Sequence, residues 1–503
     1  MRQPGEFPDA PSGASSHPDQ PGGTRAFAHN AFWMLLSDLT SKVASFILVI
    51  IIARGLGAEE YGYFNFAVSF VPIFLFLGTL GVNVEVFRAI ARDRSSLSQV
   101  FSSGLVLRGS FGLLALVLSA AIGFLVLGGG VALLALVLVA VALFLDEMSR
   151  LVGTVFIAFE RMRFHALVVL VNRTMSTLLA GVALASGGGL ILITAAYLLG
   201  SVGALLFAWI ALRRFFPPVR FRDADSSEMK GILKRGLHIG VASTVNMLTF
   251  RLDVVLLQVM RGPIAVAMYG IAYRFFESFL FVSWSLANVI LPRVARSDGG
   301  SSATQPFQMA LALVLTLYVP LAIGALFASE WIVIKVFSPR YAAAAPAIRW
   351  LTGALVLYGV AYLARTATIA LGTRRGVAQV AVVSLIMNVA LNLVFIPRYG
   401  FMAAAASTFA TEVVDATLLI VLFVRAAGGF RPESFIAVPL LAGAAMAGIL
   451  WISDSSGGTV LLVGPVVYAL VIAAGALLLA PDATKRAVRS LRRPAATRPP
   501  LDQ

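Results

Sequence analysis

The chain has 503 residues, of which 59% are hydrophobic and only 13% are charged. Soluble domains carry roughly 25% charged residues, so this composition excludes a water-soluble globular protein. The sequence contains no cysteine, which excludes disulfides, thiolate metal sites and cysteine nucleophiles.

The formal net charge is +15, from 39 Lys and Arg against 24 Asp and Glu. The basic residues are dispersed between apolar runs instead of forming one basic face, and this pattern disfavours nucleic-acid binding. No lysine lies in a GxxxxGK[ST] loop, so we do not expect the chain to hydrolyse ATP.

The N-terminal segment is rich in Pro, Gly, Ser and Asp and has few large apolar residues. Such a composition cannot offset chain entropy by burial, so residues 1–27 are predicted to be a disordered cytoplasmic tail. No short apolar segment follows Arg2, and the first hydrophobic run, which begins near Ala31, is long enough to span a bilayer. We therefore expect the first helix to stay in the membrane.

Runs of about 20 apolar residues, bounded by Gly, Pro and Arg clusters, predict about fourteen transmembrane helices. The expected fold is an all-α polytopic membrane protein with two six-helix bundles in a parallel pseudo-repeat and two C-terminal helices. The predicted parts are the tail 1–27, the N-terminal bundle 28–212, a basic cytoplasmic linker 213–235, the C-terminal bundle 236–428, two extra transmembrane helices 429–480 and a basic cytoplasmic tail 481–503.

The distribution of Lys and Arg between the spans predicts the orientation. Alternate connections hold 26 basic residues, whereas the intervening connections hold 5. Since cytoplasmic loops accumulate Lys and Arg, both termini are predicted to be cytoplasmic. The predicted outer connections are short, which disfavours a membrane polymerase or glycosyltransferase because such an enzyme needs a sizeable catalytic loop. We therefore do not expect an enzyme.

Two hairpins six spans apart have similar sequences. The first reads Ala53-Arg54-Gly55 and then Tyr61-Gly62, and the second reads Met260-Arg261-Gly262 and then Tyr269-Gly270. Parallel repeats of this kind are found in transporters built from two bundles. Alternatively, Arg-Gly and Tyr-Gly are ordinary ends of helical hairpins.

Ionisable residues inside the predicted spans are costly, and they are expected to face a bundle interior or a wet cavity. Three sets are spaced to pair on one helical face and to neutralise themselves: Asp38 with Lys42, Asp146 with Arg150, and Arg274 with Glu277. Two further acids, Glu412 and Asp415, either titrate or form structural pairs.

Four arginines have no acid within four residues on their own helix, namely Arg108, Arg173, Arg349 and Arg365. They must find partners on other helices, in water or in an anionic substrate. The planar guanidinium group suits bidentate phosphate contacts. Interhelical ion pairs that lock the bundles together are the alternative reading for any one of them.

Several motifs together resemble the polysaccharide-transporter branch of the MOP flippase superfamily, that is, Wzx-like O-antigen and exopolysaccharide flippases. The resemblance covers roughly residues 29–430. Its motifs are Asn30-Ala31-Phe32-Trp33, Ala53-Arg54-Gly55-Leu56-Gly57, Glu60-Tyr61-Gly62, Gly78-Thr79-Leu80-Gly81, Phe87-Arg88, Phe250-Arg251-Leu252-Asp253, Met268-Tyr269-Gly270, Ala272-Tyr273-Arg274, Leu291-Pro292-Arg293, Arg340-Tyr341 and Ile396-Pro397-Arg398-Tyr399-Gly400.

The resemblance implies a plasma-membrane flippase that carries an undecaprenyl-diphosphate-linked oligosaccharide from the cytoplasmic to the outer leaflet by alternating access. Its expected partners are this lipid-linked oligosaccharide, membrane lipids and other polysaccharide-assembly membrane proteins. No cofactor, metal or nucleic acid is expected.

A cationic cavity between the bundles is expected to hold the anionic headgroup. The predicted binding residues are Arg54, Arg173, Arg251, Arg274, Arg349 and Arg365, and the predicted orienting or ion-coupling acids are Asp38, Asp253 and Glu277. Of these, Arg54, Arg251, Asp253 and Arg274 fall on motif positions. Two related functions remain open: a MATE-type exporter of small molecules, which needs an aromatic or acidic pocket for organic cations, and a lipid II flippase.

Overall fold

The computed structural model describes residues 24–79, 81–296, 300–429, 436–453 and 457–479. Every regular element in these ranges is a helix, which confirms the predicted all-α fold. Long helices follow from the apolar runs, because a helix satisfies its own backbone hydrogen bonds where no water is available. Most of the predicted N-terminal tail and all of the predicted C-terminal tail lie outside the described residues.

The helices fall into two sets. The first set is α1 (Thr24–Gly55), α2 (Ala58–Thr79), α3 (Val82–Arg92), α4 (Leu97–Leu127), α5 (Gly130–Ala158), α6 (Met162–Ala185) and α7 (Leu190–Phe215). The second set is α8 (Ser226–Arg261), α9 (Pro263–Ala295), α10 (Gly300–Ile332), α11 (Ala345–Ala370), α12 (Arg374–Tyr399), α13 (Phe401–Ala427), α14 (Ala437–Ile452) and α15 (Gly458–Leu479). The short turns are η1 (Arg94–Ser96), η2 (Phe221–Asp223), η3 (Val333–Phe337) and η4 (Pro339–Ala344).

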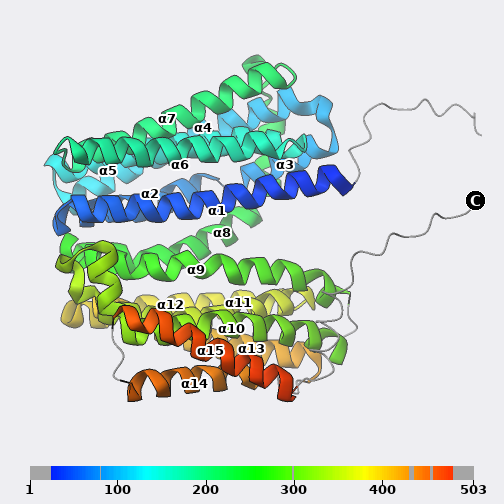
Figure 1. Cartoon of the computed structure of the whole chain (residues 1–503). Coiled ribbons are helices and arrows are strands. Elements are labelled where there is room, and N and C mark those ends of the chain that lie inside the picture. The colour runs from blue at the N-terminus through cyan, green and yellow to red at the C-terminus, as the bar shows by residue number, and fades with distance from the viewer. Residues whose placement is uncertain (1–23, 80, 297–299, 430–435, 454–456, 480–503) are drawn as a thin grey trace, which may run out of the picture.

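Figure 1 shows these two sets as two stacked lobes. Most of the helix axes are roughly aligned, and consecutive helices cross the molecule in opposite directions. Helices α1 and α9 lie at the boundary between the lobes. They are close together where α1 ends and α9 begins, and they diverge toward the start of α1. Helices α14 and α15 cover the outside of the second lobe against α10.

The two repeated hairpins meet where α2 packs against α9. A Cβ atom at Gly62 would collide with the carbonyl oxygen of Pro263, and one at Gly270 would collide with the side chain of Asn65. The Asn65 amide also donates a hydrogen bond of 3.2 Å to the carbonyl of Val266. The glycines of the Tyr-Gly motifs are therefore needed for close packing between the two lobes.

Helix α3 is an element that the apolar pattern does not predict. It is only 11 residues long, and its buried apolar residues Val82, Val86 and Ile90 recur every fourth position. That spacing gives an amphipathic stripe instead of a continuous apolar run, so a search for spans misses it.

Helix α8 begins earlier than expected. The Asp225 side chain accepts a hydrogen bond of 3.1 Å from the backbone N–H of Glu228, which caps the helix. Residues 226–235, which the sequence assigns to the basic linker, therefore form the first turns of α8. Arg235 in these turns pairs with Glu85 of α3 at 3.2 Å, so this end of α8 contacts the first lobe.

Ten helices within the described ranges are long and apolar enough to cross a membrane, and Ala437–Ile452 is a shorter apolar helix. Helices α1, α2 and α8 are not among the ten, and each contains side chains that are not described. The predicted number of fourteen spans is therefore not confirmed.

Candidate functional site

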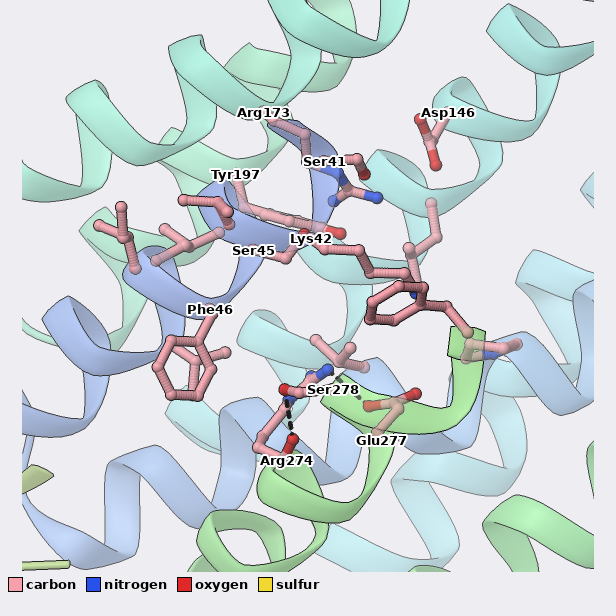
Figure 2. A pocket seen from close by; sticks show the side chains of 18 of the residues that line it. Ser41, Lys42, Ser45, Phe46, Asp146, Arg173, Tyr197, Arg274, Glu277 and Ser278 are labelled. Carbon is pink, nitrogen blue, oxygen red and sulfur yellow. Dashed lines mark hydrogen bonds and ion pairs between the residues drawn. The ribbon is translucent and has the colours of Figure 1, made fainter. Parts of the chain in front are cut away.

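A cavity of about 590 Å³ lies between the lobes. Its walls come from α1, α2, α5, α6 and α7 on one side and from α8 and α9 on the other. Figure 2 shows side chains from both lobes pointing toward this space. The charged lining residues are Lys42, Asp146, Arg150, Arg173, Arg251, Arg274 and Glu277.

The wall of the first lobe contains an internal ion-pair network. Arg150 pairs with Asp146 at 3.0 Å, as their spacing on α5 predicts. Glu147 lies 3.8 Å from the same guanidinium group, and it also pairs with the buried Arg108 of α4. Asn172 of α6 donates a hydrogen bond of 3.3 Å to Asp146. These contacts fix Arg150 at the cavity wall, where 55% of its side chain stays exposed.

The wall of the second lobe is organised around one carboxylate. Glu277 accepts one contact from Arg251 of α8 at 2.8 Å, and another from Arg274 of α9 at 2.9 Å. The contact with Arg274 is the i,i+3 pair predicted from the sequence. The contact with Arg251 joins two helices, and sequence spacing gives no indication of it.

Two cations in the cavity have no contact with any carboxylate that the structure describes. Arg173 of α6 interacts electrostatically with Asp146, but among the described residues it forms no hydrogen bond or ion pair. Lys42 of α1 lies over the ring of Trp284 of α9, at 5.7 Å from its centre. Its predicted partner Asp38 lies on α1, but the side chain of Asp38 is outside the described part of the structure.

The described lining carries five basic and two acidic side chains. Basic groups in this excess attract anions, because opposite charges interact strongly where water is partly excluded. The remaining lining includes hydroxyl groups from Ser41, Ser45, Tyr197 and Ser278, which can donate and accept hydrogen bonds. The arrangement can therefore hold a ligand with an anionic part and a hydroxyl-rich part.

The other predicted site residues lie elsewhere. Arg349 of α11 donates to the hydroxyl of Ser329 at 2.9 Å. Asp253 of α8 is buried and accepts a hydrogen bond from the Tyr269 hydroxyl. Neither of these predicted residues lines the cavity.

Arg365 belongs to a separate polar cluster inside the second lobe, and it does not line the cavity either. It pairs with Asp415 of α13 at 2.7 Å. Asp415 also accepts a hydrogen bond of 2.9 Å from Ser384. Glu412 lies one turn earlier on α13, and one of its oxygens is buried with no hydrogen-bond partner among the described residues. We call Arg365, Ser384, Glu412 and Asp415 the C-lobe cluster.

Arg54 lies outside the cavity lining, at the end of α1, where it contacts the second lobe. Its guanidinium donates to the carbonyl groups of Val336 at 2.9 Å and Phe337 at 3.2 Å, and to that of Lys335. In the opposite direction, Arg340 donates to the carbonyl of Leu56 at 2.6 Å. These reciprocal contacts, which we call the arginine clasp, tie the lobes together at this end.

Three lining residues that the sequence hypothesis did not assign to the site are Lys42, Asp146 and Arg150. Their spacing indicated pairs that neutralise themselves, and for Asp146 and Arg150 the pair does form. A pair that is satisfied on its own helix can still border a cavity. Sequence spacing predicts which residues pair along one helix, but it does not predict whether that face of the helix points toward a cavity.

The family model for "Polysaccharide biosynthesis protein" matches residues 27–298, which is more than half of the chain. No curated protein matches the chain.

Solved structures of two other transporters are similar in fold. The lipid II flippase MurJ in an inward closed conformation matches with a TM-score of 0.71 and 15% identity, covering 92% of this chain and 100% of that chain. An inward-facing MATE multidrug resistance transporter of the MOP superfamily matches with a TM-score of 0.60 and 17% identity, covering 77% of this chain and 93% of that chain. At these identities the likeness establishes the fold alone, and the fold is that of an all-α membrane transporter.

Proposed function

Since the chain belongs to the polysaccharide biosynthesis protein family and has the fold of MOP-superfamily transporters, we propose that it flips a polyprenyl-diphosphate-linked oligosaccharide across the plasma membrane. The product serves surface polysaccharide assembly. The observation that carries this proposal is the excess of basic side chains in the cavity between the lobes.

The cavity offers separate surfaces for the parts of such a substrate. Arg173, Arg251 and Arg274 are the groups that bind the diphosphate, because guanidinium groups form charge-assisted hydrogen bonds with phosphate oxygens. The hydroxyl groups of Ser41 and Ser45 face the sugar. The polyprenyl chain stays in the lipid, where no polar partner is needed. Arg349, Arg365 and Asp253 support the second lobe from outside the cavity.

Alternating access follows from the way the lobes are joined. The arginine clasp joins the lobes where α1 meets α2, and in this proposal that is the closed end of the cavity. With both termini in the cytoplasm, as the distribution of Lys and Arg predicts, this closed end faces outward. The substrate then enters from the cytoplasmic side, where α1 and α9 diverge (Figure 1). Rocking of the lobes would break the clasp and expose the cavity to the other side.

The membrane potential favours this direction of transport. Moving one negative charge outward gains about 2.3 kcal/mol per 100 mV of inside-negative potential. A diphosphate diester carries two negative charges, so the potential alone supplies a driving force.

The test is deletion of the gene in its host, followed by assay of surface polysaccharide and of lipid-linked intermediates. We expect loss of the surface glycan, with intermediates trapped in the inner leaflet. Complementation with the wild-type chain restores the glycan. Arg173→Ala is expected to lower the transport rate by about ten- to hundredfold, because a hydrogen bond to a charged group contributes roughly 1.5–3 kcal/mol.

The matched control is Arg214→Ala. Arg214 lies at the end of α7 over the ring of Phe215 and does not line the cavity, so its loss should leave transport intact. Normal glycan with increased sensitivity to cationic drugs would instead identify an exporter. Trapped lipid II with a normal surface glycan would identify a lipid II flippase.

A further inference from the structure

Glu277 contacts two arginines of the second lobe that line the cavity. Its two carboxylate oxygens are used separately, one by Arg251 at 2.8 Å and one by Arg274 at 2.9 Å. These arginines come from different helices, and both line the cavity. A single negative charge is therefore shared between two positive charges.

The shared carboxylate leaves both arginines with unused hydrogen-bonding capacity. The Nε atoms of Arg251 and Arg274 are buried, and neither has a hydrogen-bond partner in the described part of the chain. A guanidinium group has five N–H donors and binds planar or tetrahedral oxyanions best through two parallel hydrogen bonds. Glu277 supplies only one oxygen to each guanidinium group, whereas a larger anion can supply two oxygens to each.

We propose that Glu277 is an internal counter-ion which the diphosphate of the substrate displaces, and that this exchange selects diphosphates over monophosphates. The inference rests on the proposed function. A diphosphate diester carries one charge and two unesterified oxygens on each phosphate, so it can face both arginines with two oxygens each. A monophosphate ester has a single phosphorus centre and cannot serve both guanidinium groups in this way.

The displaced carboxylate also stabilises the substrate-free protein after the product has been released. Two neighbouring guanidinium groups without a counter-charge are costly in a partly dry cavity. When the product leaves, Glu277 contacts Arg251 and Arg274 again and lowers the local net positive charge from two to one. Competition from Glu277 weakens substrate binding, and the same competition speeds release.

This exchange and a purely structural role for Glu277 predict effects of opposite sign. If Glu277 only positioned Arg251 and Arg274, its neutralisation would disorder them and weaken diphosphate binding. If Glu277 competes with the substrate, its neutralisation strengthens diphosphate binding and slows turnover. KM and kcat then fall together, because the tighter complex is also the slower one to release.

The experiment uses the purified full chain in lipid nanodiscs, with farnesyl diphosphate and farnesyl monophosphate as probes. We expect Glu277→Gln to bind farnesyl diphosphate about tenfold more tightly than the wild type and to discriminate less against the monophosphate. Glu277→Asp keeps the charge, but its shorter side chain cannot reach both arginines, so about threefold tighter binding is expected. Glu412→Gln is the matched control, because Glu412 is an intramembrane carboxylate that does not line the cavity.

Each outcome has a distinct meaning. Equal or weaker diphosphate binding by both Glu277 variants, with the wild type still binding the probe, would overturn the exchange but leave the proposed function standing. Failure of the wild type to bind farnesyl diphosphate at all would overturn the proposed function and the exchange with it. Because an unpaired charge can also lower stability, thermal unfolding of each variant is measured with and without the probe. Exchange predicts a larger ligand-induced rise in Tm for Glu277→Gln than for the wild type.

Discussion

The cavity and the C-lobe cluster contain similar arginine–carboxylate pairs, yet their charges are balanced in opposite ways. In the C-lobe cluster, one arginine faces two carboxylates, and the Arg365–Asp415 distance is 2.7 Å. In the cavity, five basic side chains face two acidic ones, and the pair distances are 2.8–3.0 Å. The geometry of an ion pair therefore does not distinguish a binding site from a structural contact.

The balance of charge and the unused hydrogen-bond donors distinguish the two regions better. The Asp415 side chain is only 6% exposed, and Ser384 occupies its second oxygen. Among the described residues, Arg251 and Arg274 each keep a buried Nε without a hydrogen-bond partner, and Arg173 forms no ion pair. The cluster is arranged to stay closed within one lobe, whereas the cavity can accept additional negative charge.

The largest expected effect is on stability, and it comes from the C-lobe cluster. Asp415→Asn leaves the guanidinium of Arg365 without its ion-pair partner among helices α11 to α13. Removing one partner of a fully buried pair costs about 3–5 kcal/mol, and this is an upper value here because 27% of the Arg365 side chain is exposed and Glu412 remains in the cluster. We expect a large fall in thermal stability and in the amount of folded protein, measured by size-exclusion chromatography with fluorescence detection over a temperature series.

The matched change in the cavity is Asp146→Asn. Arg150 keeps Glu147 at 3.8 Å as a second partner, and its side chain is largely exposed. The loss of stability should therefore be well below that of Asp415→Asn. Equal losses at the two positions would show that the cavity pair is as structural as the C-lobe pair, and the contrast between the regions would fail.

Sequence patterns were sufficient for the all-α fold and for two of the three local pairs, while the third, Asp38 with Lys42, stays a prediction because the Asp38 side chain is not described. The all-α fold and the pairs Asp146–Arg150 and Arg274–Glu277 are confirmed, because both depend on contacts within one helix or one apolar run. For Arg108 the sequence left a partner on another helix, water and an anionic substrate open, and the structure shows the first of these, a contact with Glu147 of α5.

The composition of the cavity could not be predicted in the same way. It depends on how α1, α5, α6, α8 and α9 are rotated about their axes, and neither charge nor depth in the membrane specifies that rotation. Arg349 and Arg173 have the same sequence signature, an intramembrane arginine without a local acid. In the structure, Arg349 donates a hydrogen bond to the Ser329 hydroxyl, whereas Arg173 lines the cavity.

A smaller effect is expected at the arginine clasp, on the equilibrium between closed and open states. Arg54→Gln loses most of the contacts with three backbone carbonyl groups across the lobe boundary. A loss of about 1–2 kcal/mol follows from the usual net contribution of such hydrogen bonds, and the open population should rise by about five- to thirtyfold. Because the natural chain lacks cysteine, a single Leu56→Cys reporter beneath the clasp can be labelled with an impermeant maleimide from outside.

Arg261 provides the control for the clasp, since it occupies the same place in the repeated hairpin. It donates to the carbonyl groups of Ile396 at 3.1 Å and of Pro397, both at the end of α12 within the second lobe. Arg261→Gln should therefore leave labelling of Leu56→Cys unchanged. Faster labelling with Arg261→Gln, or no change with Arg54→Gln, would argue against a clasp between the lobes.

The smallest effect is expected for Lys42, which contributes charge to the cavity without a hydrogen bond to any described carboxylate. Lys42→Gln removes one positive charge and its contact with the Trp284 ring. Such cation–π contacts contribute about 0.5–1 kcal/mol at exposed sites, so the initial transport rate should fall by about two- to fivefold. Lys42→Arg keeps the charge and should restore most of the rate. If Lys42→Gln instead lowered the transport rate by about ten- to hundredfold, as Arg173→Ala is expected to do, Lys42 would have to touch the substrate directly. The diphosphate site would then lie between α1 and α9, closer to the boundary of the lobes than the arginines alone indicate.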